Sequence, residues 1–222
     1  MSGSIIQHAV TEPNPPPGTP LTLAFGSNVT AGNAIVVFAA NLNGGTVSFG
    51  TCTDNHSDAF SALSGCAITD ATRAVSMKAY AAFGVAGGAT TVQVPYSGSP
   101  NLLTLYLFEV SGVGGFDAGS ASTGTTTTAS TTSFTTTHAS DLCIATTLQE
   151  STSAGAGTGF TLIEITAAMA NCLEFTTFAS SGSHTATAQG DGSNQVWGIN
   201  AATFFPASSG AAKNAILFGT VA

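Results

Sequence analysis

The densest group of polar side chains in the sequence lies at residues 54–58, which read Asp-Asn-His-Ser-Asp. Carboxylate and amide oxygens at alternating positions are ligands that Ca²⁺ accepts, since this ion takes about six to eight oxygens. Asp and Asn are equally common in turns, where their side chains accept hydrogen bonds from nearby backbone N–H groups. We therefore expect a turn and no cofactor here, and we keep calcium held by Asp54 and Asp58 as the alternative.

Catalytic arrangements of serine, histidine and acidic residues have little support. The sequence contains no Gly-x-Ser-x-Gly motif, which marks the nucleophile of many hydrolases. The histidines stand beside Ser, Thr or Ala in ordinary strand or loop contexts: His8, His56, His138 and His184. Three glutamates in apolar strands could form a carboxylate pair for glycoside hydrolysis or face solvent: Glu109, Glu164 and Glu174. Glu174 alternates with apolar neighbours, so we expect it to face solvent, and we expect no enzymatic activity.

The four cysteines allow three complete pairings and lack the Cys-x-x-Cys spacing of zinc or redox sites. Cys52 and Cys66 flank a short polar segment, and Cys143 and Cys172 each lie in an apolar run. These positions suggest two disulfides, Cys52–Cys66 and Cys143–Cys172. The alternative is four buried free thiols, which pack as small hydrophobic groups.

Composition restricts the partners. Only three residues are basic and the net charge is −8, so binding to a nucleic-acid backbone is excluded. The 14 phenylalanines outnumber the tyrosines and the single Trp197, which favours core packing over the exposed rings that bind sugars. We expect no signal peptide in this chain, since its start has neither a basic nor an apolar region, and we expect no membrane span, since no apolar run is long enough.

The periodicity of the chain is that of strands. Apolar and polar residues alternate in segments such as 21–25 and 75–83, whereas 34–40 and 102–110 are continuously apolar. Glycine-rich turns separate these segments. We predict an all-β protein: an antiparallel two-sheet β-sandwich, jelly-roll-like, with about a dozen strands and no major helix. The sandwich domain is expected over 21–206.

The two ends differ from the sandwich. Residues 1–20 are expected to form an extended arm with a proline-rich lead-in, because each proline fixes its own φ and restricts the preceding residue. Residues 207–222 are expected to form a tail or an extra strand. Either end could reach a neighbouring copy, and the candidate assembly residues are Pro15, Pro16, Pro17, Ile216, Leu217 and Phe218.

An ordered series of segments over roughly residues 30–206 resembles a group of Gly/Thr/Ser-rich β-sandwich domains found in bacterial surface or secreted proteins and in bacteriophage structural proteins. The segments are Asn33–Ala39, Cys52–Phe60, Met77–Ala82, Gly88–Val94, Phe108–Val113, Phe116–Ala118, Ala139–Ala145, Gly159–Leu162 and Trp197–Phe205. The resemblance implies a jelly-roll-like fold in a virion or on a cell surface, and it implies no reaction.

The scarcity of ionic side chains suggests a role. Sheet proteins normally protect their edges with Lys or other charges, and this chain has very few. We therefore expect a structural protein that packs β surfaces between copies, most of all a virion component such as a capsid decoration or a tail- or fibre-associated protein. Its partners would be itself and other structural proteins, and its location a virion or the cell exterior. The alternative is a surface adhesion or carbohydrate-binding module.

Overall fold

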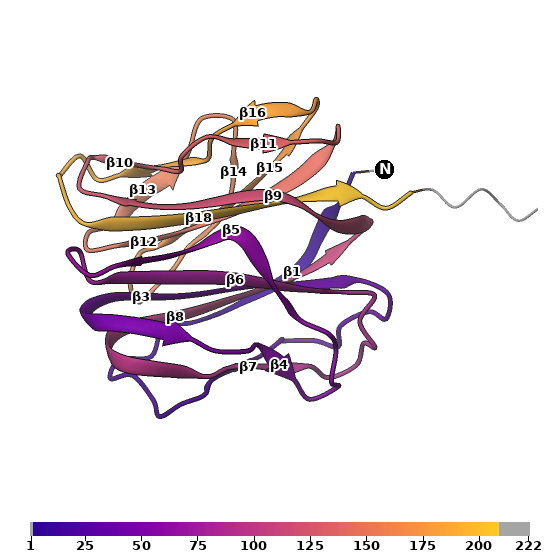
Figure 1. Cartoon of the computed structure of the whole chain (residues 1–222), viewed down its shortest axis with the longest axis horizontal. Helices are drawn as coiled ribbons and strands as arrows, with labels where there is room; N and C mark the ends of the chain where they lie inside the picture. The colour runs from indigo at the N-terminus through magenta and orange to yellow at the C-terminus, as the bar shows by residue number, and fades with distance from the viewer. Residues whose placement is uncertain (1, 209–222) are drawn as a thin grey trace, which may run out of the picture.

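The computed structural model describes residues 2–208, and within them every regular element is a strand paired antiparallel with its neighbours. The predicted all-β antiparallel sandwich without a major helix is thereby confirmed. The structure contains 18 strands rather than about a dozen, because several outer strands of two to four residues are too short to show an alternating pattern. The sheets are stacked in four layers (Figure 1).

The N-terminal half forms two of these layers. Its five-stranded sheet has the order β1-β8-β3-β6-β5 and its three-stranded sheet the order β2-β7-β4. The larger sheet comprises β1 (Ser4–Thr11), β8 (Tyr96–Ser111), β3 (Ala34–Phe49), β6 (Val75–Phe83) and β5 (Ser61–Asp70). The smaller sheet comprises β2 (Leu21–Ala24), β7 (Thr91–Val94) and β4 (Thr53–Asp54).

The C-terminal half forms the other two layers. Its five-stranded sheet comprises β9 (Val113–Gly124), β18 (Trp197–Pro206), β12 (Asp141–Gln149), β15 (Cys172–Phe178) and β14 (Thr161–Ile165), in that spatial order. Its outer layer comprises β10 (Thr128–Ser130), β17 (Thr187–Gly190) and β13 (Ser153–Ala156), with a separate pair of β11 (Phe134–Thr136) and β16 (Gly182–His184).

The two halves share one topology. In each half the first strand is an edge strand that pairs with the last, giving the order 1-8-3-6-5 in the first half and 9-18-12-15-14 in the second. The smaller sheets correspond in the same way, as 2-7-4 and 10-17-13. Both first strands carry an extra residue near their start, between Ile5 and Gln7 in β1 and between Phe116 and Gly119 in β9, and β9 has a second one between Val113 and Gly115. The chain is therefore two copies of one sandwich plan, with β11 and β16 added to the second.

The halves pack through their five-stranded sheets in a reciprocal manner. Strand β5 of the first half lies on β9 of the second, and β14 of the second lies beside β1 of the first, where Nε2 of His8 is 2.8 Å from Oε2 of Glu164. This arrangement approximates a two-fold interface within one chain, with a closer approach of the backbones at β5–β9 than at β14–β1. The core between these sheets includes Phe38, Tyr106 and Phe204.

Both inner sheets are covered on both faces, which explains their sequences. Residues Ala34–Leu42 of β3 and all nine residues of β12 are buried. A strand buried on both faces is continuously apolar, whereas alternation marks a strand with one wet face. The apolar runs noted in the sequence are therefore the central strands of the stack.

Candidate functional site

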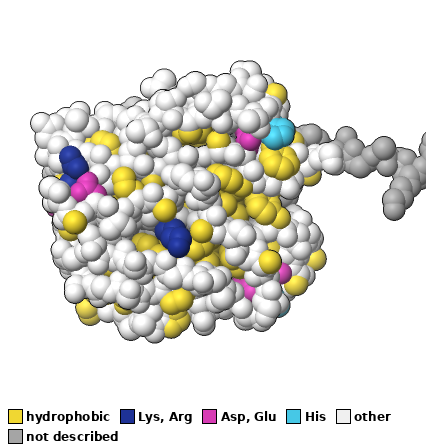
Figure 2. Space-filling model, viewed as in Figure 1, with side chains coloured by type: hydrophobic (Ala, Val, Ile, Leu, Met, Phe, Trp, Pro, Cys, Tyr) yellow, Lys and Arg dark blue, Asp and Glu magenta, His cyan; other side chains and the backbone are white. Residues whose placement is uncertain are grey.

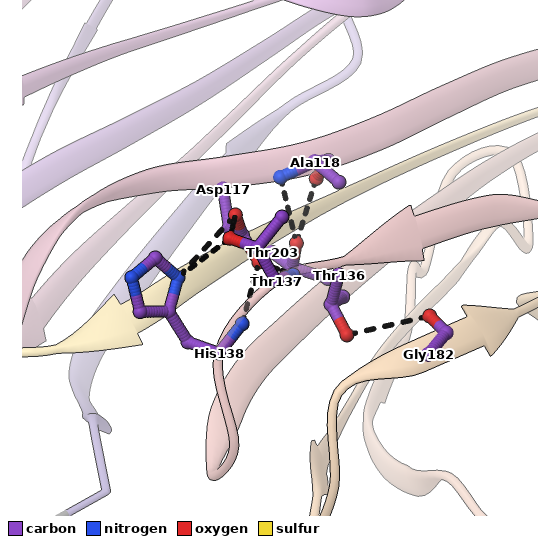
Figure 3. Close-up of polar contacts among 7 residues, drawn as sticks. All are labelled: Asp117, Ala118, Thr136, Thr137, His138, Gly182 and Thr203. Atoms are coloured by element: carbon purple, nitrogen blue, oxygen red, sulfur yellow. Dashed lines mark hydrogen bonds and ion pairs between the residues drawn. The ribbon is translucent and has the colours of Figure 1, made fainter.

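Three ionisable side chains meet at one end of the C-terminal half. Asp117 comes from β9, His138 from the turn after β11, and Asp141 is the first residue of β12. Each offers one ligand atom, and these atoms all lie within 4.8 Å of one another. Figure 3 shows two members of this Asp117–His138–Asp141 cluster together with their hydrogen-bonding neighbours.

Asp117 is held as a charged carboxylate. The backbone N–H of Thr137 donates to Oδ2 at 2.6 Å, and the Thr137 hydroxyl donates to Oδ1 at 2.6 Å. Burial would raise the pKa of Asp117, but the hydrogen bonds from Thr137, Asp141 and the His138 backbone outweigh it and lower the pKa to about 2. Asp117 lies at the β9 bulge, and a bulge changes the direction in which a side chain points.

Asp141 has the opposite character. Its side chain is fully buried, and in the carboxylate form neither oxygen receives a hydrogen bond from a donor. Burial, followed by the adjacent Asp117 carboxylate, raises the pKa of Asp141 to about 7. Near neutral pH, the protonated form of Asp141 can share its proton with Asp117.

His138 closes the open side of the cluster. Its side chain is 50% exposed, and its Nδ1 lies 3.4 Å from Oδ1 of Asp117 and 2.9 Å from the Thr137 hydroxyl. The ring stacks on Phe205 at a centroid distance of 4.6 Å, which fixes its orientation. An imidazole nitrogen and two carboxylates are a donor set that can hold a divalent cation or relay a proton.

No feature of the sequence favours this cluster, because a Thr/Ser-rich segment separates Asp117 from His138 and Asp141. Asp141 offers one signal: it is a charged residue directly before the strand-like run 142–148. That signal becomes meaningful only once β12 is known to be buried on both faces.

The predicted segment 54–58 begins at the last residue of β4 and continues into the turn that follows it. Oδ1 of Asp54 accepts hydrogen bonds from the backbone N–H groups of His56 and Asp58, both at 3.0 Å. Oδ1 of Asp58 accepts from the Ala86 backbone at 2.9 Å. The other oxygen of each carboxylate is buried without a partner. Calcium at Asp54 and Asp58 stays a prediction that rests on these two carboxylates.

The predicted disulfides Cys52–Cys66 and Cys143–Cys172 are wrong, since all four cysteines are buried free thiols. Cys52 packs between the two N-terminal sheets, whereas Cys66 points to the other face, where its thiol donates to the carbonyl of Ala201 at 3.3 Å. Cys143 pairs with Thr176, four residues from Cys172, or about 13 Å along a strand. A disulfide requires Cα atoms within about 7 Å.

The expected exposure of Glu174 is also wrong. Its side chain is fully buried, with Oε2 accepting a hydrogen bond from the Gly157 backbone at 2.7 Å, and burial raises the pKa of Glu174 to about 7. The outer layer covers the side of β15 that alternation assigned to solvent. Glu109 is buried in the other half, and Glu164 contacts His8, so the three glutamates occupy three separate environments.

The rings considered for sugar binding serve mainly as core. Trp197 is 7% exposed and its indole N–H donates to the Thr126 carbonyl at 3.1 Å. Tyr80 and Tyr106 are buried, and the half-buried Tyr96 donates its hydroxyl hydrogen to the Pro17 carbonyl.

The assembly candidates divide between two parts of the chain. Pro15, Pro16 and Pro17 lie in the connection from β1 to β2, where the Pro17 carbonyl contacts Tyr96. Ile216, Leu217 and Phe218 lie outside the described residues.

Comparison with protein-family models, with curated proteins and with solved structures finds no match to this chain. Among residues 2–208, no helix is long and apolar enough to cross a membrane.

Proposed function

We propose that this protein is a non-enzymatic structural component of an assembly, most of all a virion component that decorates a capsid or belongs to a tail or fibre. It would act by packing its β surfaces against other copies and against other structural proteins. The observation that carries the proposal is the absence of basic residues from the sheet edges.

The edges of the four larger sheets are formed by β1, β5, β9 and β14 and by β2, β4, β10 and β13. Within residues 2–208 none of these strands contains Lys or Arg. Lys78 lies on the interior strand β6, and Arg73 lies in the β5–β6 turn, where it pairs with Asp70 at 2.7 Å. Figure 2 shows a face made mostly of neutral side chains and backbone.

Such edges favour association. An edge strand presents unpaired N–H and C=O groups that a second chain can bind, and Lys or Pro normally prevents this. Thr, Ser, Gly and Ala side chains also lose little conformational entropy when buried at a contact, unlike Lys or Glu.

The alternative of an adhesion or carbohydrate-binding module has weaker support, because three of the four Trp and Tyr rings are buried. An array of glycans with a reproducible hit that is lost on Tyr96→Ala would favour it.

The test is light scattering of the purified full chain over a wide concentration range. We expect reversible association that weakens in Thr22→Lys on β2 and in Thr161→Lys on β14, since both positions are exposed on edge strands. The control is Asn194→Lys, which adds the same charge in the exposed loop after β17. Thermal melting verifies that all three variants fold. A strict monomer at every concentration would contradict the proposal, as would equal weakening by all three substitutions.

A further inference from the structure

The shared topology allows the two halves to be compared residue by residue at the turn before their central strands. The turn before β3 reads Thr30-Ala-Gly-Asn33, and the turn before β12 reads His138-Ala-Ser-Asp141. The third residue of each has a positive φ, 88° at Gly32 and 65° at Ser140. The backbone is therefore the same in kind, and Asn33 corresponds to Asp141 as Thr30 corresponds to His138.

In the N-terminal half, hydrogen-bond donors satisfy the buried carboxylate at this turn. A single buried carboxylate, Glu109 of β8, accepts hydrogen bonds from the Asn33 side chain at 2.6 Å and from the Thr30 backbone at 2.8 Å. The Gln7 side chain donates to its other oxygen at 2.6 Å. One negative charge thus meets three donors, as buried carboxylates require.

In the C-terminal half the donor is replaced by a second acid. Asp117 takes the place of Glu109 as the carboxylate that accepts from the turn, through the backbones of Thr137 and His138. Asp141 stands where Asn33 supplies its amide hydrogens, and as a carboxylate it has none to donate. Both of its oxygens are buried without a partner, facing Asp117 and His138. A cation at this position would satisfy both carboxylates.

We propose that Asp117, His138 through Nδ1 and Asp141 bind a divalent transition-metal cation, of which Zn²⁺ is the representative. A mixed set of one imidazole and two carboxylates suits Zn²⁺ and similar ions, whereas Ca²⁺ and Mg²⁺ prefer oxygen ligands alone and more of them. Without a cation the His138 Nδ1 donates to the Thr137 hydroxyl, since that hydroxyl gives its own hydrogen to Asp117. A cation would take the place of the Nδ1 proton, and Nε2, which makes no hydrogen bond within residues 2–208, would then carry the proton of the neutral ring.

The site would be structural. Its ligands come from the edge strand β9, from the turn after β11 and from the start of the central strand β12. A metal would therefore tie the edge of the five-stranded sheet to its centre, at the position where the other half uses the Asn33–Glu109 hydrogen bond.

The experiment is calorimetric titration of the tag-free full chain, first treated with chelator, with Zn²⁺, Mn²⁺, Ca²⁺ and Mg²⁺ in turn. We expect one Zn²⁺ per chain, bound more tightly than Ca²⁺ or Mg²⁺, with a rise in melting temperature. Asp141→Asn copies the residue of the other half, so it should fold. It should weaken Zn²⁺ binding by more than about 100-fold, the upper end of the loss seen when an outer partner of a metal ligand is removed.

The control is Glu164→Gln, which removes the carboxylate from the other contact between an imidazole and an acid, His8–Glu164. This variant should bind Zn²⁺ as the unmodified chain does. Co²⁺ provides a second readout, since its visible absorption reports nitrogen and oxygen ligation directly. The proposal is overturned if Asp141→Asn binds Zn²⁺ as tightly as the unmodified chain, or if the unmodified chain binds none of the four ions and only a proton occupies the cluster.

Discussion

Asp141 and Asn33 occupy equivalent positions in the two turns, but the Asn33 side chain can donate hydrogen bonds and the Asp141 carboxylate can only accept them. The amide of Asn33 donates a hydrogen bond to the Glu109 carboxylate. The Asp141 carboxylate instead lies beside the Asp117 carboxylate, so a proton or a cation must neutralise its charge. A polar residue at the start of a strand buried on both faces therefore determines which cations or protons the end of the sandwich takes up.

A pH prediction follows for the chain without metal. The pKa of Asp141 is about 7 in the folded chain against an ordinary value of 3.8, so the stability contributed by its protonated form is complete below pH 3.8 and is lost progressively as the pH rises from there to 7. In chelator, Asp141→Asn should therefore gain about 1–3 kcal/mol of stability relative to the unmodified chain between about pH 4 and about pH 8. Urea unfolding at both pH values measures this. An identical difference at the two pH values would contradict it.

The cysteines give a second prediction at this scale. Burial raises the pKa of Cys66 and of Cys172 to about 12, the latter aided by Glu174, so both thiols stay protonated and unreactive in the folded chain. We expect iodoacetamide to modify none of the four cysteines under native conditions and all four in denaturant without reductant. Intact mass measures the number of additions. Two or no additions in denaturant would indicate disulfides.

At the scale of elements, a glycine allows β9 to pack tightly against β5. A Cβ on Gly119 of β9 would overlap the Cys66 sulfur of β5 and would lie 2.6 Å from the Ala201 carbonyl oxygen. Both neighbours belong to packed strands and cannot move away cheaply.

Gly119→Ala should therefore destabilise the chain by about 1–3 kcal/mol or more. Gly155→Ala is the matched control, since its Cβ would meet nothing within 4 Å and its φ is ordinary, so it should change stability little. Chemical denaturation of the two variants compares them. Equal stability of the two variants would contradict the prediction, since it would mean that β5 and β9 can move apart with little loss of unfolding free energy.

The sequence predicted the elements of the inner sheets well, because their long apolar or alternating runs match strand periodicity. The run 34–40 lies in β3 and the run 102–110 lies in β8. Short outer strands such as β4 and β10 have too few residues to show a pattern. The exposure of Glu174 could not be predicted correctly, because an alternating pattern distinguishes the two faces of a strand but does not show that other layers cover both faces.

The candidate site could not be predicted from the sequence, because it depends on how distant strands pair. Asp117 and Asp141 approach each other only through the pairing of β9, β18 and β12, and that order depends on the whole sheet. The repeated plan left faint traces, such as Phe60 before β5 and Phe160 before β14. Such traces are too short to separate from the surrounding Thr- and Gly-rich sequence.

For the whole molecule, the reciprocal packing of the halves predicts how fragments behave. Gly112 alone separates β8 from β9, and a break there would expose the faces that carry Phe38 and Phe204. Large exposed apolar faces drive association.

We expect fragments 1–112 and 113–222, produced together, to copurify as a one-to-one complex, and either alone to aggregate or pair with itself. Co-expression with a tag on one fragment, followed by native mass measurement, tests this. A soluble, monomeric fragment 1–112 would contradict it.

The pairing of first with last strands also dictates when the molecule can form. Ser4 pairs with Ser111, and Val113 with Pro206, so neither sandwich has its edge in place until its whole length has left the ribosome. Contacts so distant along the chain make folding slow. The first sandwich can nevertheless pair its first and last strands before the second sandwich can, and its uncovered inner sheet then offers the surface against which the second packs.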